Sequence, residues 1–113
     1  MASAKKIRRG SKTLANRTTL GHAKRILRAH LPALRDRYAV KSLGVFGSYV
    51  RGDQHPRSDL DVLVEFERAP SLFTYGELED HLSQLVGIKV DLVMKKTLKP
   101  HIGRAILAEV VPL

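Results

Sequence analysis

Two aspartates, Asp59 and Asp61, lie at the start of an otherwise apolar run in residues 58–66, SDLDVLVEF. In a strand, residues two apart point to the same side, about 7 Å apart along the chain, so both carboxylates face a common point. Ionised carboxylates are costly to bury without a compensating cation, and oxygen donors of this kind suit Mg²⁺. Asp59 follows a loop and also fits a turn or cap, but Asp61 lies among apolar residues. The pair therefore predicts a metal site.

A third carboxylate, Asp91, lies in the apolar run KVDLVM of residues 89–94. If this run forms a strand beside residues 60–66, Asp91 can converge with Asp59 and Asp61. Three carboxylates can hold two metal ions, and such a pair of ions stabilises the attacking and leaving oxygens of an in-line displacement.

Upstream, Gly47 and Ser48 directly follow a predicted strand and begin a predicted helical turn. Such a turn presents backbone N–H groups and a hydroxyl to an anion, and glycine lets a phosphate approach closely. A phosphate-binding turn facing a carboxylate metal site indicates nucleotidyl or phosphoryl transfer. Arg51 can hold a phosphate or brace the loop by pairing with an acid, because arginine serves both roles.

The elements that must position these residues follow from apolar periodicity and turn signals. Apolar residues recur at three- and four-residue steps over residues 19–38, which predicts a helix, and Pro32 predicts either a kink or a break into two helices. Strands are expected at residues 41–46, 60–66 and 89–94, one or two helical turns within 47–52, a loop at 54–57, helices at 72–86 and 98–109, and a short last strand within 110–113.

Glycine and proline refine this outline. Gly87 is expected to cap the helix of residues 72–86, and Pro100 to lie in the first turn of the last helix. Apolar and polar residues alternate poorly over residues 60–66, which indicates a central strand covered on both faces. The order of elements predicts an α+β fold in which helices pack on a single mixed β-sheet.

Charge is distributed unevenly along the 113 residues, whose net charge is +9. Residues 1–35 contain ten of the 20 Lys and Arg and no acid, whereas the other ten are balanced by all 11 acids. We therefore expect a flexible basic arm over residues 1–17 and one domain over residues 18–113. The arm can bind nucleic acid such as RNA, or an acidic partner. It can equally be a solvated tail, and its composition also occurs in organelle transit peptides.

Composition excludes several classes of protein. The absence of cysteine excludes disulfides, thiolate zinc sites and thiol nucleophiles, and it fits a cytoplasmic protein. No apolar run approaches the roughly 20 residues that span a bilayer, so no membrane contact is expected.

The histidines and tyrosines are not expected to do chemistry. The five histidines lack metal-ligand spacing and are predicted to be surface or loop residues. The tyrosines Tyr38, Tyr49 and Tyr75 are predicted to be packing residues.

The segments GSYVRG, SDLDVLVEF and KVDLV together resemble the minimal nucleotidyltransferases of the DNA polymerase beta superfamily. The resemblance covers roughly residues 31–113 and implies a polymerase beta-like nucleotidyltransferase fold. It implies that Asp59 and Asp61 bind two Mg²⁺ ions and that Asp91 supports one ion and orients the attacking hydroxyl. It further implies that Ser48 contacts the triphosphate of ATP. The expected nucleotide-binding set is Gly47, Ser48, Arg51 and Ser58.

Relatives of this size are similar to the antitoxin half of a two-gene module, paired with an all-helical HEPN-type ribonuclease toxin. The resemblance implies transfer of AMP from ATP to a toxin tyrosine, within a hetero-oligomer. The length of 113 residues also favours an outside acceptor, because it leaves no room for an acceptor domain. Two alternatives stay open. One is a non-catalytic antitoxin that masks the toxin by binding. The other is an RNA-directed nucleotidyltransferase, against which stands an aromatic content of only 5%.

Overall fold

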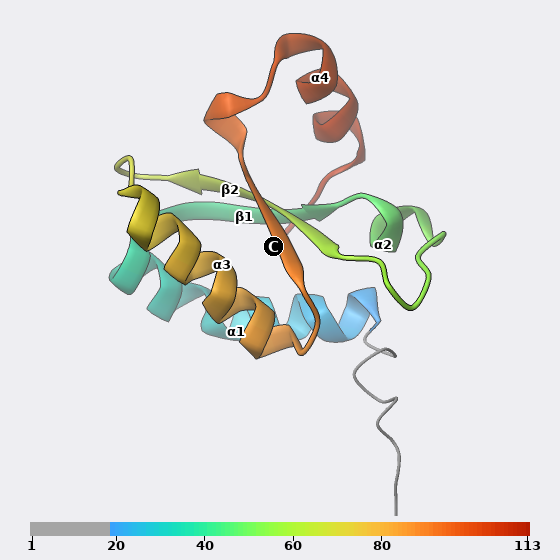
Figure 1. Cartoon of the computed structure of the whole chain (residues 1–113), viewed down its shortest axis with the longest axis horizontal. Helices are drawn as coiled ribbons and strands as arrows, with labels where there is room; N and C mark the ends of the chain where they lie inside the picture. The colour runs from blue at the N-terminus through green and yellow to red at the C-terminus, as the bar shows by residue number, and fades with distance from the viewer. Residues whose placement is uncertain (1–18) are drawn as a thin grey trace, which may run out of the picture.

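The computed structural model describes residues 19–113, and its elements follow the order expected from the sequence (Figure 1). They are Leu20–Tyr38 (α1), Val40–Phe46 (β1), Ser48–Arg51 (α2), Leu60–Phe66 (β2), Leu72–Val86 (α3), Val90–Met94 (β3), the 3₁₀ turn Lys95–Thr97 (η2), Pro100–Glu109 (α4) and Val111–Pro112 (β4). The bounds of β2 and α3 match those predicted. By contrast, β1 begins one residue early, β3 one residue late, and η2 takes up part of the segment before α4.

The sheet has four strands in the order β3-β2-β1-β4. β1 pairs antiparallel with β2 and with β4, whereas β2 pairs in parallel with β3. This confirms a mixed sheet, the central place of β2 and the pairing of a short last strand. The parallel pair needs a crossover connection, which α3 supplies.

Helices α1 and α3 cover one face of the sheet, and α4 lies over the other (Figure 1). Leu60 and Val62 of β2 are fully buried in the core beneath α1 and α3. Because side chains alternate along a strand, Asp61, Leu63 and Glu65 face the side of α4. Leu63 is buried but Glu65 is only partly so. The expected cover on both faces is therefore complete on one face and partial on the other, where one short helix lies.

Helix α1 is continuous through Pro32, so the predicted alternative of two helices is wrong. Leu31 and Leu34 flank Pro32 and are buried in the same apolar stripe, whereas Pro32 itself is exposed. An internal proline removes a helical hydrogen bond at a cost of about 3 kcal/mol, which the burial of this stripe offsets. The helix begins after Thr19, whose side chain accepts a hydrogen bond from the His22 N–H.

The outer edge of β3 is closed by side chains of α3. The Val90 N–H donates to Ser83 Oγ at 2.9 Å, and the Leu92 N–H donates to Glu79 Oε2 at 2.8 Å. The Tyr75 hydroxyl donates to the Leu92 carbonyl. Exposed backbone groups on a sheet edge favour unwanted pairing, and these contacts satisfy them. β3 is therefore held between β2 and α3, and α3 ends at a left-handed Gly87 cap as predicted.

Residues 1–17, predicted to form a basic arm, lie outside the described residues, so the boundary expected at residue 18 stays a prediction. Residues 19–113 share a core cluster that joins α1, α3 and the sheet. In this part of the chain, no helix combines the length and the apolar character needed to cross a membrane.

Candidate active site

Asp61 and Asp91 lie side by side on neighbouring strands. They are register partners in the parallel pair β2–β3, and the residues that precede them, Leu60 and Val90, are buried in the core. Because side chains alternate, both carboxylates point away from α1 and α3, toward the face on which α4 lies. Asp59 is half-buried just before β2, and its charge acts on Asp61.

The Asp61 carboxyl is difficult to ionise in this position. Burial, followed by the negative charges of Asp91 and Asp59, raises its pKa from 3.8 to about 6. The Arg51 guanidinium opposes this shift but does not cancel it. A carboxylate whose charged form is disfavoured by burial and by like charges is stabilised by a nearby cation. The electrostatics around Asp61 therefore favour cation binding.

An open cavity of about 480 Å³ adjoins these carboxylates. Its lining residues are Ser48, Arg51, Asp53, His55, Ser58, Asp59 and Asp61. The cavity brings together most of the residues predicted from the sequence, but Gly47 and Asp91 are outside its lining. Its volume is typical of small-molecule sites, and its wall is mainly polar, as a nucleotide phosphate chain requires.

Gly47 has a backbone conformation that requires glycine. Its φ of 83° and ψ of −154° lie in a region essentially restricted to glycine. A Cβ at this position would lie 2.0 Å from Asp61 Oδ2, so the Gly47 backbone rests directly against that carboxylate. The Gly47 N–H donates to Glu109 Oε2 at 2.7 Å. The phosphate-binding role expected for Gly47 stays a prediction, because here a carboxylate of the chain itself accepts this hydrogen bond.

Arg51 pairs with two acids. Its Nε lies 3.2 Å from Asp53 Oδ2, and its Nη1 lies 3.0 Å from Glu109 Oε1. The Arg51 side chain is still about half exposed, at 51%, and it lines the cavity. Of the two roles considered for Arg51, the structure has the bracing contacts, and the phosphate contact stays a prediction.

The loop before β2 is held by its own hydrogen bonds. Ser58 Oγ accepts from the His55 N–H at 2.9 Å, and His55 Nδ1 accepts from the Arg57 N–H at 3.2 Å. A neutral imidazole that accepts at Nδ1 carries its proton at Nε2. His55 is a loop residue, as predicted, but it also lines the cavity and so can offer a donor to a phosphate.

The donor set suits Mg²⁺, although the side chains as placed do not enclose an ion. Within residues 19–113, no three or more His, Cys, Asp or Glu side chains are grouped so that they could hold a metal. The expected convergence of Asp59, Asp61 and Asp91 into one closed group is thus not met in this structure. Mg²⁺ commonly takes only one or two carboxylates and completes its shell with water and substrate phosphates. The adjacent carboxylates of Asp61 and Asp91, with Asp59 before them, fit that requirement.

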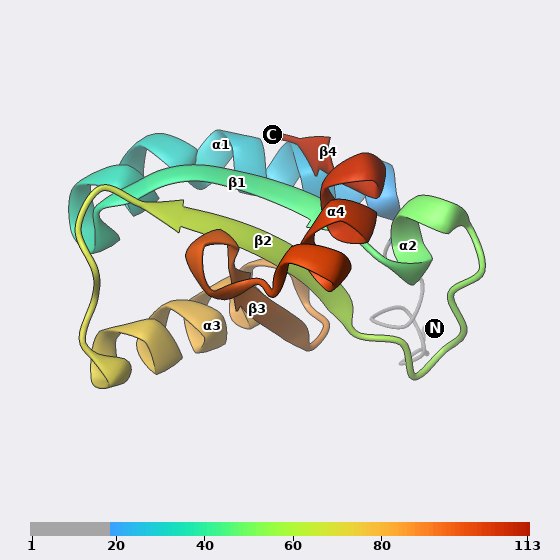
Figure 2. The same cartoon turned by 90° about the horizontal axis from the view of Figure 1, so that it is seen from above.

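Three residues contact or line the site without belonging to any recognised motif: Asp53, His55 and Glu109. Asp53 and His55 lie in the loop between the segments GSYVRG and SDLDVLVEF, so their position in the sequence could have identified them as site residues. Glu109 reaches the site because α4 returns over the sheet and ends beside the Gly47 turn (Figure 2). Sequence spacing gives no indication of that contact.

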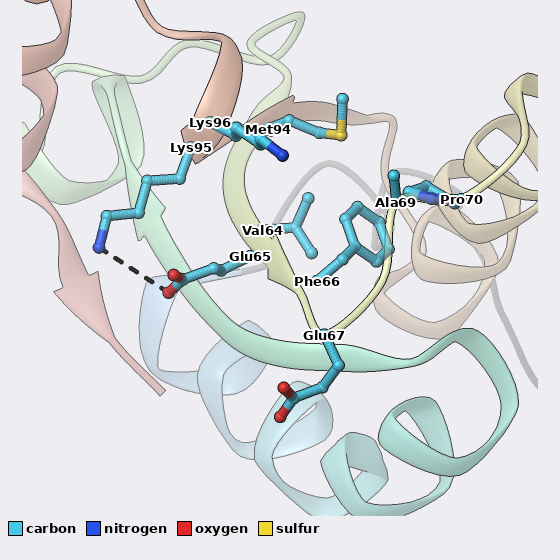
Figure 3. Close-up of a pocket in the computed structure, with 9 residues that line it drawn as sticks. All are labelled: Val64, Glu65, Phe66, Glu67, Ala69, Pro70, Met94, Lys95 and Lys96. Carbon is cyan, nitrogen blue, oxygen red and sulfur yellow. Dashed lines mark ion pairs between the residues drawn. The ribbon is translucent and has the colours of Figure 1, made fainter.

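A second cavity, of about 430 Å³, lies at the other end of β2 (Figure 3). Val64, Phe66 and Met94 contribute apolar walls. Glu65, on its rim, pairs with Lys95 at 3.8 Å. None of the site residues predicted from the sequence lines this cavity, so the candidate active site is the one next to Asp61.

Comparison with known proteins identifies relatives over most of the chain. Residues 27–112 match the family Nucleotidyltransferase domain. The chain is 52% identical over 93 residues to protein adenylyltransferase MntA of Thermococcus cleftensis, which covers 82% of this chain and 94% of that protein. It is 49% identical over 89 residues to a protein of Methanocaldococcus jannaschii assigned as a protein adenylyltransferase, covering 78% and 91% of the two chains.

Solved structures share the same architecture. One, assigned as a minimal nucleotidyltransferase, superposes with a TM-score of 0.73 at 34% identity over 86% of this chain and 98% of its own. One chain of a mutant MntA–HpeT toxin–antitoxin complex superposes with a TM-score of 0.63 at 25% identity, over 76% of this chain and 69% of its own.

Proposed function

The chain belongs to the nucleotidyltransferase domain family, and from this membership we propose that it is a Mg²⁺-dependent protein adenylyltransferase that acts as an antitoxin. In this proposal it transfers AMP from ATP to a tyrosine hydroxyl of a helical HEPN-type ribonuclease toxin. The polymerase beta-like fold and the nucleotidyltransferase class predicted from the sequence are confirmed by the family match and by the minimal nucleotidyltransferase structure.

The observation that carries the proposal is the pairing of Asp61 with Asp91 beside the polar cavity. Parallel pairing fixes the two carboxylates on neighbouring strands and on one face of the sheet. Ser48, which has a hydroxyl, and Arg51, which has a guanidinium, line the same cavity as Asp61. Nucleotidyl transfer needs carboxylates that bind cations, and it needs donors such as a hydroxyl and a guanidinium that bind phosphates. Both kinds of group lie side by side here.

In the proposed reaction, the phenol oxygen of the acceptor attacks the α-phosphorus of ATP. A phosphorus–oxygen bond forms to the acceptor, the bond from the α-phosphorus to the bridging oxygen of the β-phosphate breaks, and pyrophosphate leaves. The phenol proton must be removed, because phenols are protonated at neutral pH. Asp91 is exposed on β3. We propose that it orients the attacking hydroxyl by accepting a hydrogen bond from it and that it takes up the phenol proton during the attack.

Binding of ATP is assigned to the residues that line the cavity. Arg51 is proposed to hold the β- and γ-phosphates through its planar guanidinium, together with Ser48 Oγ. Asp59, Asp61 and Asp91 would hold the two Mg²⁺ ions, which when bound neutralise the phosphate charge and polarise the reacting phosphoryl group.

The relatives support a protein acceptor. The relative from Thermococcus cleftensis is a protein adenylyltransferase named MntA, and an MntA is one half of the MntA–HpeT toxin–antitoxin complex. We therefore propose that the acceptor is a partner toxin and that the two chains form a hetero-oligomer. A tyrosine on an extended segment of the partner can reach the open side of the cavity.

The two alternative functions make different predictions for labelled ATP. Incubation of the chain with the toxin, Mg²⁺ and ATP labelled at the α-phosphate should label the toxin, and ATP labelled at the γ-phosphate should not. Label on RNA in place of the toxin would support the RNA-directed alternative. Loss of toxicity without any label on the toxin would support the masking alternative. Addition of EDTA is the control, because it removes the proposed Mg²⁺.

A further inference from the structure

Glu109, the last residue of α4, makes two hydrogen bonds to the candidate active site. Its Oε2 accepts from the Gly47 N–H at 2.7 Å, and its Oε1 accepts from Arg51 Nη1 at 3.0 Å. The Glu109 side chain is only 23% exposed. A carboxylate that is largely buried and used by both oxygens forms strong, charge-assisted hydrogen bonds.

Both groups that Glu109 holds are parts of the site. Gly47 rests against the Asp61 carboxylate in a conformation that only glycine adopts, and it immediately precedes Ser48. Arg51 lines the cavity together with Ser48 and Asp61. Glu109 itself does not line the cavity. It therefore acts on the site through Gly47 and Arg51 and does not occupy the space of the substrate.

We infer that Glu109 is a positioning residue for nucleotidyl transfer. It fixes the Gly47 turn against Asp61 and holds the Arg51 guanidinium at the wall of the cavity, so that Ser48 and Arg51 are in place before ATP binds. It also joins α4 to the active site, because its two hydrogen bonds link the end of this helix to the Gly47 turn and to α2. The kinetic test of this inference rests on the proposed function, whereas the binding test does not.

The test compares Glu109→Gln, Glu109→Ala and Glu109→Asp with the wild type. Glutamine is nearly isosteric, but it has no charge and only one oxygen acceptor, so it cannot hold both Gly47 and Arg51. Displacement of positioning groups by about 1 Å can lower rates by about 100-fold. We expect kcat/KM for ATP to fall by about 10- to 100-fold in the Gln and Ala variants, through a rise in KM as well as a fall in kcat. Aspartate keeps the charge and should restore part of the loss.

A purely structural role predicts a different result. Partial unfolding reduces the amount of active enzyme, and so the apparent kcat, but leaves the KM of the folded fraction unchanged. Melting curves of each variant identify such a loss. The control is Glu77→Gln, which removes a surface Glu–Arg pair, Arg37 Nη2 to Glu77 Oε2 at 3.7 Å, away from the site. It should leave KM and kcat unchanged.

The binding test needs no partner. Titration of the chain with Mg²⁺ and an ATP analogue that has a methylene between the α- and β-phosphorus should show weaker binding in Glu109→Gln than in the wild type. Equal or tighter binding would overturn the inference, and tighter binding would mean that Glu109 competes with the phosphates for Arg51. Failure of the wild type to label a toxin, with analogue binding weakened as expected, would reject the acceptor but leave the inference standing.

Discussion

Asp61 of β2 is the direct register partner of Asp91 of β3 in the parallel part of the sheet. Neighbouring strands are about 4.8 Å apart, so the backbone alone places these carboxylates close together and on one face. Their mutual repulsion and the burial of Asp61 raise the pKa of Asp61. The spacing between Asp61 and Asp91 therefore depends on the sheet and not on a loop.

Asp61→Asn should abolish AMP transfer and make the fold more stable at neutral pH. With Asp61 ionised, the folded protein contains a partly buried carboxylate beside the charges of Asp91 and Asp59. Each pKa unit corresponds to about 1.4 kcal/mol, and solvent around a partly exposed group reduces the effect, so we expect a gain of about 1–2 kcal/mol. Melting curves measured without Mg²⁺ check this.

The pH dependence of that gain follows from the sign of the shift. The pKa of Asp61 is raised to about 6 in the folded state, against 3.8 for the ordinary group. Folding is therefore penalised above about pH 6, and the penalty is relieved as the pH falls from 6 toward 4 and the folded protein takes up a proton. The stability difference between Asp61→Asn and the wild type should shrink over this range. A difference that stays constant from pH 8 to pH 4 would contradict the assigned shift.

Gly47→Ala should both destabilise the fold and abolish transfer. The added Cβ would lie 2.0 Å from Asp61 Oδ2, and the backbone has a φ of 83°. Strain of this kind costs about 1–3 kcal/mol, before the collision with Asp61 is counted. The control is Gly52→Ala, at a φ of 82° with no atom within 4 Å of its Cβ. It should cost about 1–2 kcal/mol and retain most of the activity, whereas equal losses in the two variants would exclude a specific contact between Gly47 and Asp61.

Glu79→Ala should weaken the hold of α3 on β3. It leaves the Leu92 N–H, next to Asp91, without the carboxylate that now accepts its hydrogen bond at 2.8 Å. Loss of a partner to a buried donor costs about 1–3 kcal/mol, and movement of β3 should also lower the transfer rate. Asp80→Ala is the matched control, because Asp80 is the exposed neighbour on the same helix. Similar melting temperatures and rates in the two variants would show that this edge contact is not important.

Deletion of residues 1–17 should leave the melting temperature nearly unchanged. The core cluster of the described residues is formed by α1, α3 and the sheet, all within residues 19–113. If the basic arm contacts RNA, the deletion should weaken RNA binding and reduce its dependence on salt. A fall of many degrees in the melting temperature would show that the arm is part of the fold.

Local patterns in the sequence were sufficient to predict the main elements and the carboxylates. The alternation around Asp61 and Asp91 depends only on neighbouring residues, and the two short apolar runs that contain these acids indicated paired strands. Pro32 was harder to interpret, because its local cost is offset by the burial of Leu31 and Leu34 against the sheet. That burial is a tertiary effect, which a helical pattern does not reveal.

The contacts that complete the site could not be predicted in the same way. Glu109 is far from Gly47 and Arg51 in the sequence, and the three meet only because α4 crosses the open face of the sheet. A single acid at the end of an amphipathic helix has the same pattern as a solvated charge. The sequence also could not show that the Gly47 N–H is already bonded to a carboxylate of the chain, since that bond depends on the same long-range packing.

The central claim is tested most directly by the intact mass of the partner toxin after incubation with the wild-type chain, ATP and Mg²⁺. We predict the addition of one or more AMP units, about 329 Da each, to a toxin tyrosine. The Asp59→Ala/Asp61→Ala double variant should still bind the toxin but add no mass. An unchanged toxin mass with the wild type, together with full neutralisation of the toxin by the double variant, would contradict catalysis and show that the chain acts by binding alone.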